Sequence, residues 1–291
     1  MARSTDEHGR LIEPVNTTEA DWAGVAEALS RAGALAGETV YRVGFPRRDL
    51  AVTSKGVQIK AGFALGSYAA FARYRDGKTM VMGDLVVAEE ELQRLTDALQ
   101  SNGIDQTGVH KHLLAHEPPV WWCHIHAVGA DPVAIARGIR AALDVTATPP
   151  PAAPAPPAPL DLDTAGIDAA LGAKGSNDGG IYKFSFARAE TVTSHQRVLL
   201  PAMGVSTALN FQPVGDGRAA INGDFVMTAD EVQHVIQALR AGGIEIIELH
   251  NHALDDHPRL FYMHFWAVDD AVTLANALRQ AVEAHNVQPA S

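Results

Sequence analysis

Cysteine is nearly absent from this sequence, and its scarcity excludes several kinds of site. The chain of 291 residues holds one cysteine, so an internal disulfide, a cysteine-based zinc finger and an iron–sulfur cluster are all excluded. Basic residues are also few. Lys+Arg number 23 against 34 for Asp+Glu, which gives a formal net charge of −11. This balance argues against a nucleic-acid partner and against docking on anionic membranes.

Long apolar runs are missing as well. No uncharged apolar stretch reaches 18 residues, so we expect no transmembrane segment. The residues from Met1 to His8 lack the apolar stretch of a secretory signal. The sequence therefore predicts a cytoplasmic protein if Met1 is the native start, and an envelope or periplasmic protein if a signal was removed.

The sequence does contain an internal duplication. Residues 52–128 align without gaps with residues 192–268 at an offset of 140, with 22 identities in 77 positions. The shared landmarks include Gly83-Asp84 with Gly223-Asp224, His110 with His250, His112 with His252, and His124 with His264. The repetition of whole motifs indicates two copies of one folding unit.

The duplication predicts the organisation of the chain. We expect an N-terminal tail over 1–20, repeat units over 21–144 and 163–284, and a C-terminal tail over 285–291. Residues 145–162 form a linker, because seven prolines in residues 149–159 favour an extended polyproline spacer.

Each unit has the pattern of an α+β fold. Apolar spacing predicts helices at 19–32 and 133–144, and Thr228-Ala-Asp-Glu231 is a capping box that opens another helix. Two strands follow, and one face of the return strand is apolar through Trp121, Cys123, Ile125 and Ala127. We therefore predict two similar units, each with an antiparallel sheet packed on helices, and a buried Cys123.

The opposite face of each predicted hairpin is rich in histidine. The two hairpins hold nine of the thirteen histidines. If the first turn is centred near Pro118, His112 lies opposite His124, and His110 lies opposite His126. The equivalent register sets His252 against His264, with Glu248 on the same face.

Converging imidazoles are typical of a divalent transition metal site, with Zn, Cu or Fe as the candidate ions. The candidate ligands are His110, His112, His124 and His126 in the first unit and His250, His252, His264 and Glu248 in the second. Asp84 and Asp224 are candidates for a further ligand, a residue that orients a ligand, or a catalytic base. The sites of the two units are either separate or share a cleft across a pseudo-twofold axis.

Two other interpretations stay open. The histidines also fit a polar pocket for a small ligand, with Trp122, Tyr262 and Trp266 as a stacking platform, or a purely structural network. No G-x-S-x-G, Walker A or G-x-G-x-x-G motif points to another chemistry.

Several segments resemble one known family. These are Tyr41–Val52, Val81–Val87, His110–Leu114 and His124–His126, together with their counterparts in the second unit. They are similar to the LppY/LpqO-related family, also catalogued as domain of unknown function 1259, over nearly the whole chain. The resemblance implies a bacterial protein, often an envelope lipoprotein, with no established activity. Lys111 stands where asparagine is usual, and no lipobox cysteine precedes the domain.

The sequence thus supports two hypotheses of function. The first is a metal-binding protein, either a metal-dependent hydrolase or an oxidase of a small molecule, in which the metal activates water or dioxygen. The second is a non-catalytic module of the bacterial envelope that binds a small ligand. The sequence does not predict the metal, the ligand or the oligomeric state.

Overall fold

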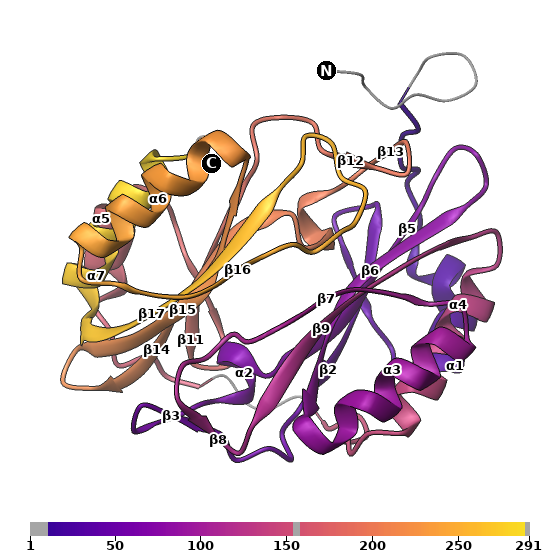
Figure 1. Ribbon diagram of the computed structural model, residues 1–291, viewed down its shortest axis with the longest axis horizontal. Helices are drawn as coiled ribbons and strands as arrows, with labels where there is room; N and C mark the ends of the chain where they lie inside the picture. Colours follow the sequence, from indigo (N-terminus) through magenta and orange to yellow (C-terminus); the bar gives the residue numbers. More distant parts are fainter. Residues whose placement is uncertain (1–10, 154–157, 289–291) are drawn as a thin grey trace.

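The computed structural model describes residues 11–153 and 158–288, which form two similar halves (Figure 1). The first half contains, in chain order, η1 (Glu19–Trp22), α1 (Ala23–Leu29), β1 (Ala34–Ala36), β2 (Val40–Pro46), β3 (Thr53–Ser54), β4 (Val57–Gln58), α2 (Ala61–Ala64), β5 (Gly66–Arg73), β6 (Thr79–Ala88), η2 (Glu89–Glu91), α3 (Leu92–Ser101), β7 (Asp105–His110), β8 (His116–Glu117), β9 (Val120–Gly129) and α4 (Pro132–Asp144). The second half contains α5 (Thr164–Leu171), β10 (Ser176–Asp178), β11 (Ile181–Ala187), β12 (Thr193–Ser194), β13 (Arg197–Val198), η3 (Pro201–Met203), β14 (Ser206–Gly215), β15 (Arg218–Met227), α6 (Ala229–Ala241), β16 (Glu245–His250), β17 (Phe261–Asp270) and α7 (Ala271–Glu283).

Each half is built on a six-stranded antiparallel sheet. The strand order is β1-β2-β5-β6-β9-β7 in the first half and β10-β11-β14-β15-β17-β16 in the second, so the two topologies are the same. Helices α1, α3 and α4 lie on one outer side of the molecule, and α5, α6 and α7 lie on the other (Figure 1). The predicted duplicated α+β fold is confirmed.

The alternation of side chains on the return strand explains how each sheet packs. Cys123, Ile125 and Ala127 of β9 belong to the core beneath α1, α3 and α4, and Met263 and Phe265 of β17 belong to the equivalent core. Successive side chains on a strand point to opposite faces, so the residues between them face away from the helices. The predicted apolar face and the buried Cys123 are both confirmed.

The opposite faces of the two sheets pack against each other. Two hydrophobic clusters contain residues from both halves; one joins Met80 and Met82 to Leu199 and Tyr262, and the other joins Trp122 to Trp266. The histidine-bearing faces are therefore brought together inside the molecule, between two apolar contacts.

The hairpin register differs from the predicted one. In the structure His110 lies opposite Trp122, and Gly108 lies opposite His124, so the predicted pairs of His112 with His124 and of His110 with His126 are wrong. In the second half His250 lies opposite Tyr262, so the predicted pair of His252 with His264 is wrong as well. Strand β7 ends at His110 because the next residues bond to the other half. The Asn222 amide donates to the His112 carbonyl oxygen over 2.6 Å, and the Glu248 carboxylate accepts the Lys111 N–H over 3.1 Å.

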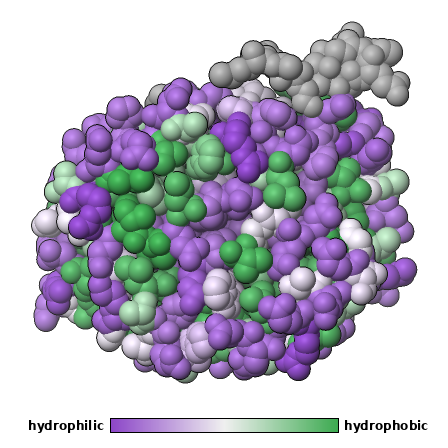
Figure 2. Space-filling view, viewed as in Figure 1, coloured by the Kyte–Doolittle hydropathy of each residue, from purple (hydrophilic) through white to green (hydrophobic). Residues whose placement is uncertain are grey.

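Figure 2 shows one face of the molecule, and this face is mostly hydrophilic. Its hydrophobic side chains form a band on the left of the view and smaller groups elsewhere. Among the described residues, no helix is long and apolar enough to span a membrane. The described part of the linker is tied to the first half where Arg31 donates to the Pro149 carbonyl oxygen over 2.6 Å.

Candidate metal centre

Two glycines bring a carboxylate to the inner face of each sheet. A Cβ at Gly83 would lie 2.5 Å from the carbonyl oxygen of Tyr68, and a Cβ at Gly223 would collide with that of Ala208. Glycine thus permits close approach of the neighbouring strand at both positions. The residues that follow, Asp84 and Asp224, pair directly with the two equivalent histidines of the return strands, which are His124 and His264.

Six histidines form three close ring pairs across the junction of the two halves, two of them stacked and one tilted. Their ring centroids lie 3.7 Å apart for His110 and His250, 3.8 Å for His112 and His264, and 3.7 Å for His124 and His252. Each pair joins one histidine from each half, so the arrangement has pseudo-twofold symmetry. We call these six residues the histidine cluster. The two histidine patches predicted from the sequence therefore lie together at the junction.

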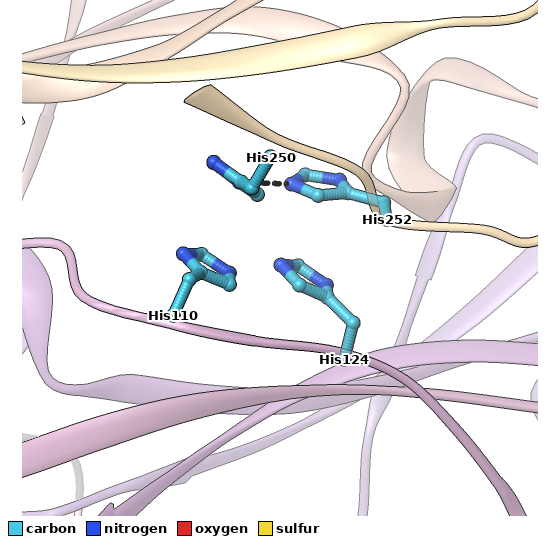
Figure 3. Close-up of side chains that lie close together, drawn as sticks. All are labelled: His110, His124, His250 and His252. Carbon is cyan, nitrogen blue, oxygen red and sulfur yellow. Dashed lines mark hydrogen bonds between the residues drawn. The ribbon is translucent and has the colours of Figure 1, made fainter. Parts of the chain in front are cut away.

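The nitrogen atoms of the cluster converge to metal-binding distances. Ligand atoms of His110, His124, His250 and His252 all lie within 4.8 Å of one another (Figure 3). The Nε2 atoms of His250 and His252 are 3.2 Å apart. Two nitrogens bound tetrahedrally at about 2.05 Å from one zinc ion would be about 3.3 Å apart. These four histidines could therefore hold a metal ion.

Three further groups in the centre have the same property. They are His110 with His112 and His264; Asp84 with His112 and His124; and Asp224 with His250 and His264. Each combines residues that the sequence analysis proposed as ligands or as catalytic carboxylates. Imidazole with carboxylate, and no thiolate, suits zinc, iron, copper or nickel.

Backbone carbonyls orient two rings of the cluster. Nδ1 of His264 lies 2.6 Å from the Gly223 carbonyl oxygen, and Nδ1 of His252 lies 3.1 Å from that of Gly204. Because a carbonyl oxygen only accepts, each Nδ1 carries the proton and each Nε2 keeps its lone pair. This is the tautomer that metal-ligating histidines adopt when the second nitrogen bonds to the backbone.

Several buried polar atoms of the centre have no hydrogen-bond partner in the described chain. They are Nδ1 and Nε2 of His110, Nε2 of His112, His124 and His264, and Oδ1 of Asp84 and Asp224. Leaving one buried polar atom unsatisfied costs about 1–3 kcal/mol. A bound cation would satisfy lone pairs that are otherwise buried without a donor.

Burial governs the protonation of the centre. It lowers the pKa of His264 to about 3, and it lowers the pKa of His110, His112, His124 and His252, with neighbouring histidines adding to the effect. Burial, reinforced by Asp224, raises the pKa of Asp84 to about 8. The imidazoles are consequently neutral at pH 7, which is the form that binds metal.

The two carboxylates lie beside the cluster. Oδ2 of Asp84 is 3.4 Å from Nε2 of His112, and Oδ2 of Asp224 is 3.0 Å from Nε2 of His252. These contacts are equivalent in the two halves. They place a carboxyl group next to one imidazole on each side of the junction.

Two of the proposed ligands lie outside the cluster. His126 is buried on β9, where its ring stacks on His195 with centroids 4.7 Å apart. Glu248 accepts the N–H of Lys111, and its carboxylate belongs to none of the candidate groups.

The three proposed stacking residues are each 1% exposed. Trp122 stacks on His112 with centroids 4.5 Å apart, and Tyr262 stacks on His252 at 3.4 Å. Trp266 packs edge-on against Phe63. The first two aromatic rings thus support rings of the cluster, and a ligand-stacking role for all three stays a prediction.

A pocket of about 440 Å³ opens onto the cluster, and both halves contribute to it. Its polar lining includes Asp84, Asp224, His112, His124, His252 and His264, together with Arg42, Tyr68 and Lys183. The last three were not among the residues predicted from the sequence. A signal was present for two of them, since Tyr41-Arg42 and Tyr182-Lys183 are equivalent in the duplication, but a basic residue on a strand usually lies on a solvated face.

The comparison with protein families identifies the chain. The family model described as Domain of Unknown Function (DUF1259) matches residues 23–145 and 165–284. The chain belongs to the DUF1259 family. This confirms the resemblance found in the sequence, and the two segments that match the DUF1259 model correspond to the two halves. No curated protein matches the chain.

Similar solved structures include shell proteins of bacterial microcompartments. The trimeric shell protein PduB is 13% identical, with 87% of this chain and 89% of that chain covered and a TM-score of 0.23. EtuB from Clostridium kluyveri is 11% identical, with the same coverage and a TM-score of 0.21. The double-ringed trimeric shell protein MSM0271 is 13% identical, with 71% and 82% covered and a TM-score of 0.19. Scores this low support no conclusion about this chain.

Proposed function

We propose that this DUF1259 protein is a metal-dependent enzyme that acts on a small molecule at the junction of its two halves. One observation carries the proposal: six histidines and two aspartates from both halves converge with unpartnered buried nitrogen and oxygen atoms, and four of these histidines and both aspartates line a pocket of about 440 Å³. A pocket of this size suits a small organic ligand. A purely structural network would instead pair its own donors and acceptors.

The histidine cluster would hold one divalent ion through nitrogens from both halves. The chemistry that zinc, iron or copper supplies when bound is the activation of water or of dioxygen. The chain's own aromatic residues orient the histidine rings of the cluster. Trp122 and Tyr262 fix the rings of His112 and His252 by stacking. Trp122 is itself fixed, because its indole N–H donates to the Ala64 carbonyl oxygen over 2.8 Å.

Asp84 and Asp224 are the proposed proton carriers. Both line the pocket, and each carboxylate lies beside one imidazole of the cluster. A carboxyl in this position can hold a proton and donate it to a leaving group, and the raised pKa of Asp84, about 8, keeps this group mostly protonated at pH 7. Because the pseudo-twofold symmetry relates the two aspartates, either one could carry the proton. The variants Asp84→Asn and Asp224→Asn would show which one does by their effects on kcat.

Metal content tests the proposal directly. Protein purified without a histidine tag should contain about one equivalent of a divalent transition metal per chain, or bind one when it is added. His124→Ala and His252→Ala remove one ligand from each half. If the site is shared, each variant loses nearly all of the metal. Two independent sites would leave about half in each variant, and that result would contradict the shared centre.

A matched control and an activity measurement complete the test. His234→Ala removes an exposed histidine of α6 and should leave the metal content unchanged. Circular dichroism checks that each variant is folded. Hydrolysis of nitrophenyl esters and phosphate esters by zinc-loaded protein, and oxygen consumption by iron- or copper-loaded protein, distinguish the two reaction classes. A folded protein that binds no metal but retains a small ligand would instead favour the non-catalytic alternative.

A further inference from the structure

The pocket has one basic side chain from each half. Arg42 of β2 and Lys183 of β11 follow the equivalent residues Tyr41 and Tyr182, and they are the two basic residues of the pocket lining. The duplication thus sets a pair of cations around the same opening that the histidine cluster faces.

Arg42 has spare hydrogen-bond donors. Its guanidinium lies 3.5 Å from the centre of the Tyr68 ring, and Nη1 donates to the Ala202 carbonyl oxygen over 2.8 Å. Within residues 11–153 and 158–288, no carboxylate lies within 4.0 Å of this guanidinium, whereas Arg47 and Arg188 are each paired with carboxylates. Guanidinium is always charged, and its rigid fork matches a carboxylate or a phosphate.

Lys183 is paired, but the pair is accessible. Its ammonium lies 2.6 Å from Oδ2 of Asp178, whose side chain is 70% exposed. An exposed ion pair of this kind is weak, so Lys183 can exchange Asp178 for an anionic ligand at little cost. The two cations therefore differ. Arg42 has donors that no carboxylate of the described residues occupies, whereas Lys183 would have to leave Asp178 to bind an anion.

The negative charge of the chain makes two cations in one pocket unexpected. The chain has a formal charge of −11, and Asp84 and Asp224 lie in the same pocket. Anions are repelled by most of such a surface and attracted where cations gather near a cavity. We propose that the pocket takes a small molecule with a carboxylate or phosphate group, which Arg42 binds through its fork and Lys183 through its charge. The proposal depends on the proposed function in one respect: the rest of the bound ligand would reach the histidine cluster.

Binding of simple anions tests this inference. Acetate and inorganic phosphate are the probes, acetamide is the uncharged counterpart of acetate, and binding is measured by calorimetry at low ionic strength on metal-free and on metal-loaded protein. We expect one or both anions to bind and acetamide not to bind. Arg42→Gln should weaken anion binding by between about tenfold and a hundredfold, the usual range for a charged hydrogen bond. The better probe distinguishes a carboxylate from a phosphate ligand.

Three variants complete the design. Arg42→Lys keeps the charge without the fork and should bind the anion with intermediate strength, and Lys183→Gln should weaken binding less than Arg42→Gln. Arg48→Gln removes an exposed arginine outside the pocket and should change nothing. Anion binding that depends on Arg42 in metal-free protein supports the inference even if no metal binds and the proposed function fails. Anion binding that is equal in wild type and Arg42→Gln, or no binding at all, would overturn it.

Discussion

A buried ion pair holds the strand that positions Asp84, and its removal gives the sharpest stability prediction. The Arg47 side chain is 0% exposed, and Glu91 is 6% exposed. Arg47 donates to Glu91 over 2.7 and 3.2 Å and to the Val86 carbonyl oxygen over 3.0 Å. Val86 follows Asp84 by two residues on β6, so the pair anchors the end of the strand beside the candidate metal centre.

The perturbation is Glu91→Gln, which keeps the shape of the side chain and removes its charge. Breaking one partner of a buried pair costs about 3–5 kcal/mol, because the other charge stays buried. Asp49 still contacts Arg47 and is 26% exposed, so it neutralises part of the charge. We therefore expect a loss near the lower end, about 3 kcal/mol of unfolding free energy.

The second half offers an internal comparison. Arg188 and Glu231 repeat the pair, and Arg188 donates to the Val226 carbonyl oxygen two residues after Asp224. The Glu231 side chain is 14% exposed, so water screens it more than Glu91. Glu231→Gln should therefore destabilise the protein by less than Glu91→Gln does.

Urea denaturation of metal-free protein at pH 7, followed by tryptophan fluorescence, measures both losses. The control is Glu90→Gln, an exposed neighbour, which should stay within about 0.5 kcal/mol of wild type. If Glu91→Gln changes stability no more than Glu90→Gln does, the buried pair does not stabilise the fold in the way predicted here.

The pH dependence of the loss has a definite sign. Burial alone would raise the pKa of Glu91, but hydrogen bonds from Arg47 and from the N–H groups of Ala147 and Ala88 outweigh it and lower the pKa below 4.5. A carboxyl whose pKa is lowered by folding stabilises the fold above its unfolded pKa, and it loses this contribution as the pH falls through its folded pKa. The difference between wild type and Glu91→Gln should therefore shrink below pH 4.5.

Three further predictions concern the centre itself. Gly223→Ala should lower the free energy of unfolding by at least about 1–3 kcal/mol, because its Cβ would collide with the Ala208 carbonyl oxygen. Nothing lies within 4 Å of a Cβ at Gly44, so Gly44→Ala should lose less than half as much in the same urea titration. Metal-free protein should lose thermal stability between pH 7.5 and 5.5, since burial lowers the pKa of cluster histidines such as His264 and unfolding then takes up protons below pH 6.5. The raised pKa values of Asp84 and Asp224 oppose this trend with two carboxyl groups against the several buried histidines. An unchanged Tm over that range would contradict the prediction. Saturation with the cognate metal at about 1,000 times its Kd should raise stability by about 4 kcal/mol, measured as a rise in Tm that chelation reverses.

The sequence by itself determined most of the architecture. The constant offset of 140 required two copies of one unit, and the period-two alternation around Cys123 separated a helix-packed face from a histidine face. The Thr228–Glu231 capping box was equally local. The Glu231 carboxylate accepts the Thr228 N–H over 2.7 Å, as the pattern predicts. These features need only neighbouring residues, or a repeat of them, to be recognised.

The register of the histidine-bearing hairpin was decided only by the tertiary structure. The segment after His110 leaves the sheet because Asn222 and Glu248 of the other half bond its backbone, and a contact between residues more than a hundred positions apart leaves no periodic signal. For the same reason the sequence paired His110 with His126, while the fold stacks His110 on His250.

The composition of the site was likewise decided by how the two halves meet. Alternation assigns a side chain to a face, but it does not say which face of one sheet covers which face of the other. The packing of the two inner faces merged two predicted histidine patches into one cluster, left His126 outside it beside His195, and brought Arg42 and Lys183 to a common pocket. A site at a pseudo-twofold junction is a property of the docking of the halves, which depends on the shape and burial of both surfaces together.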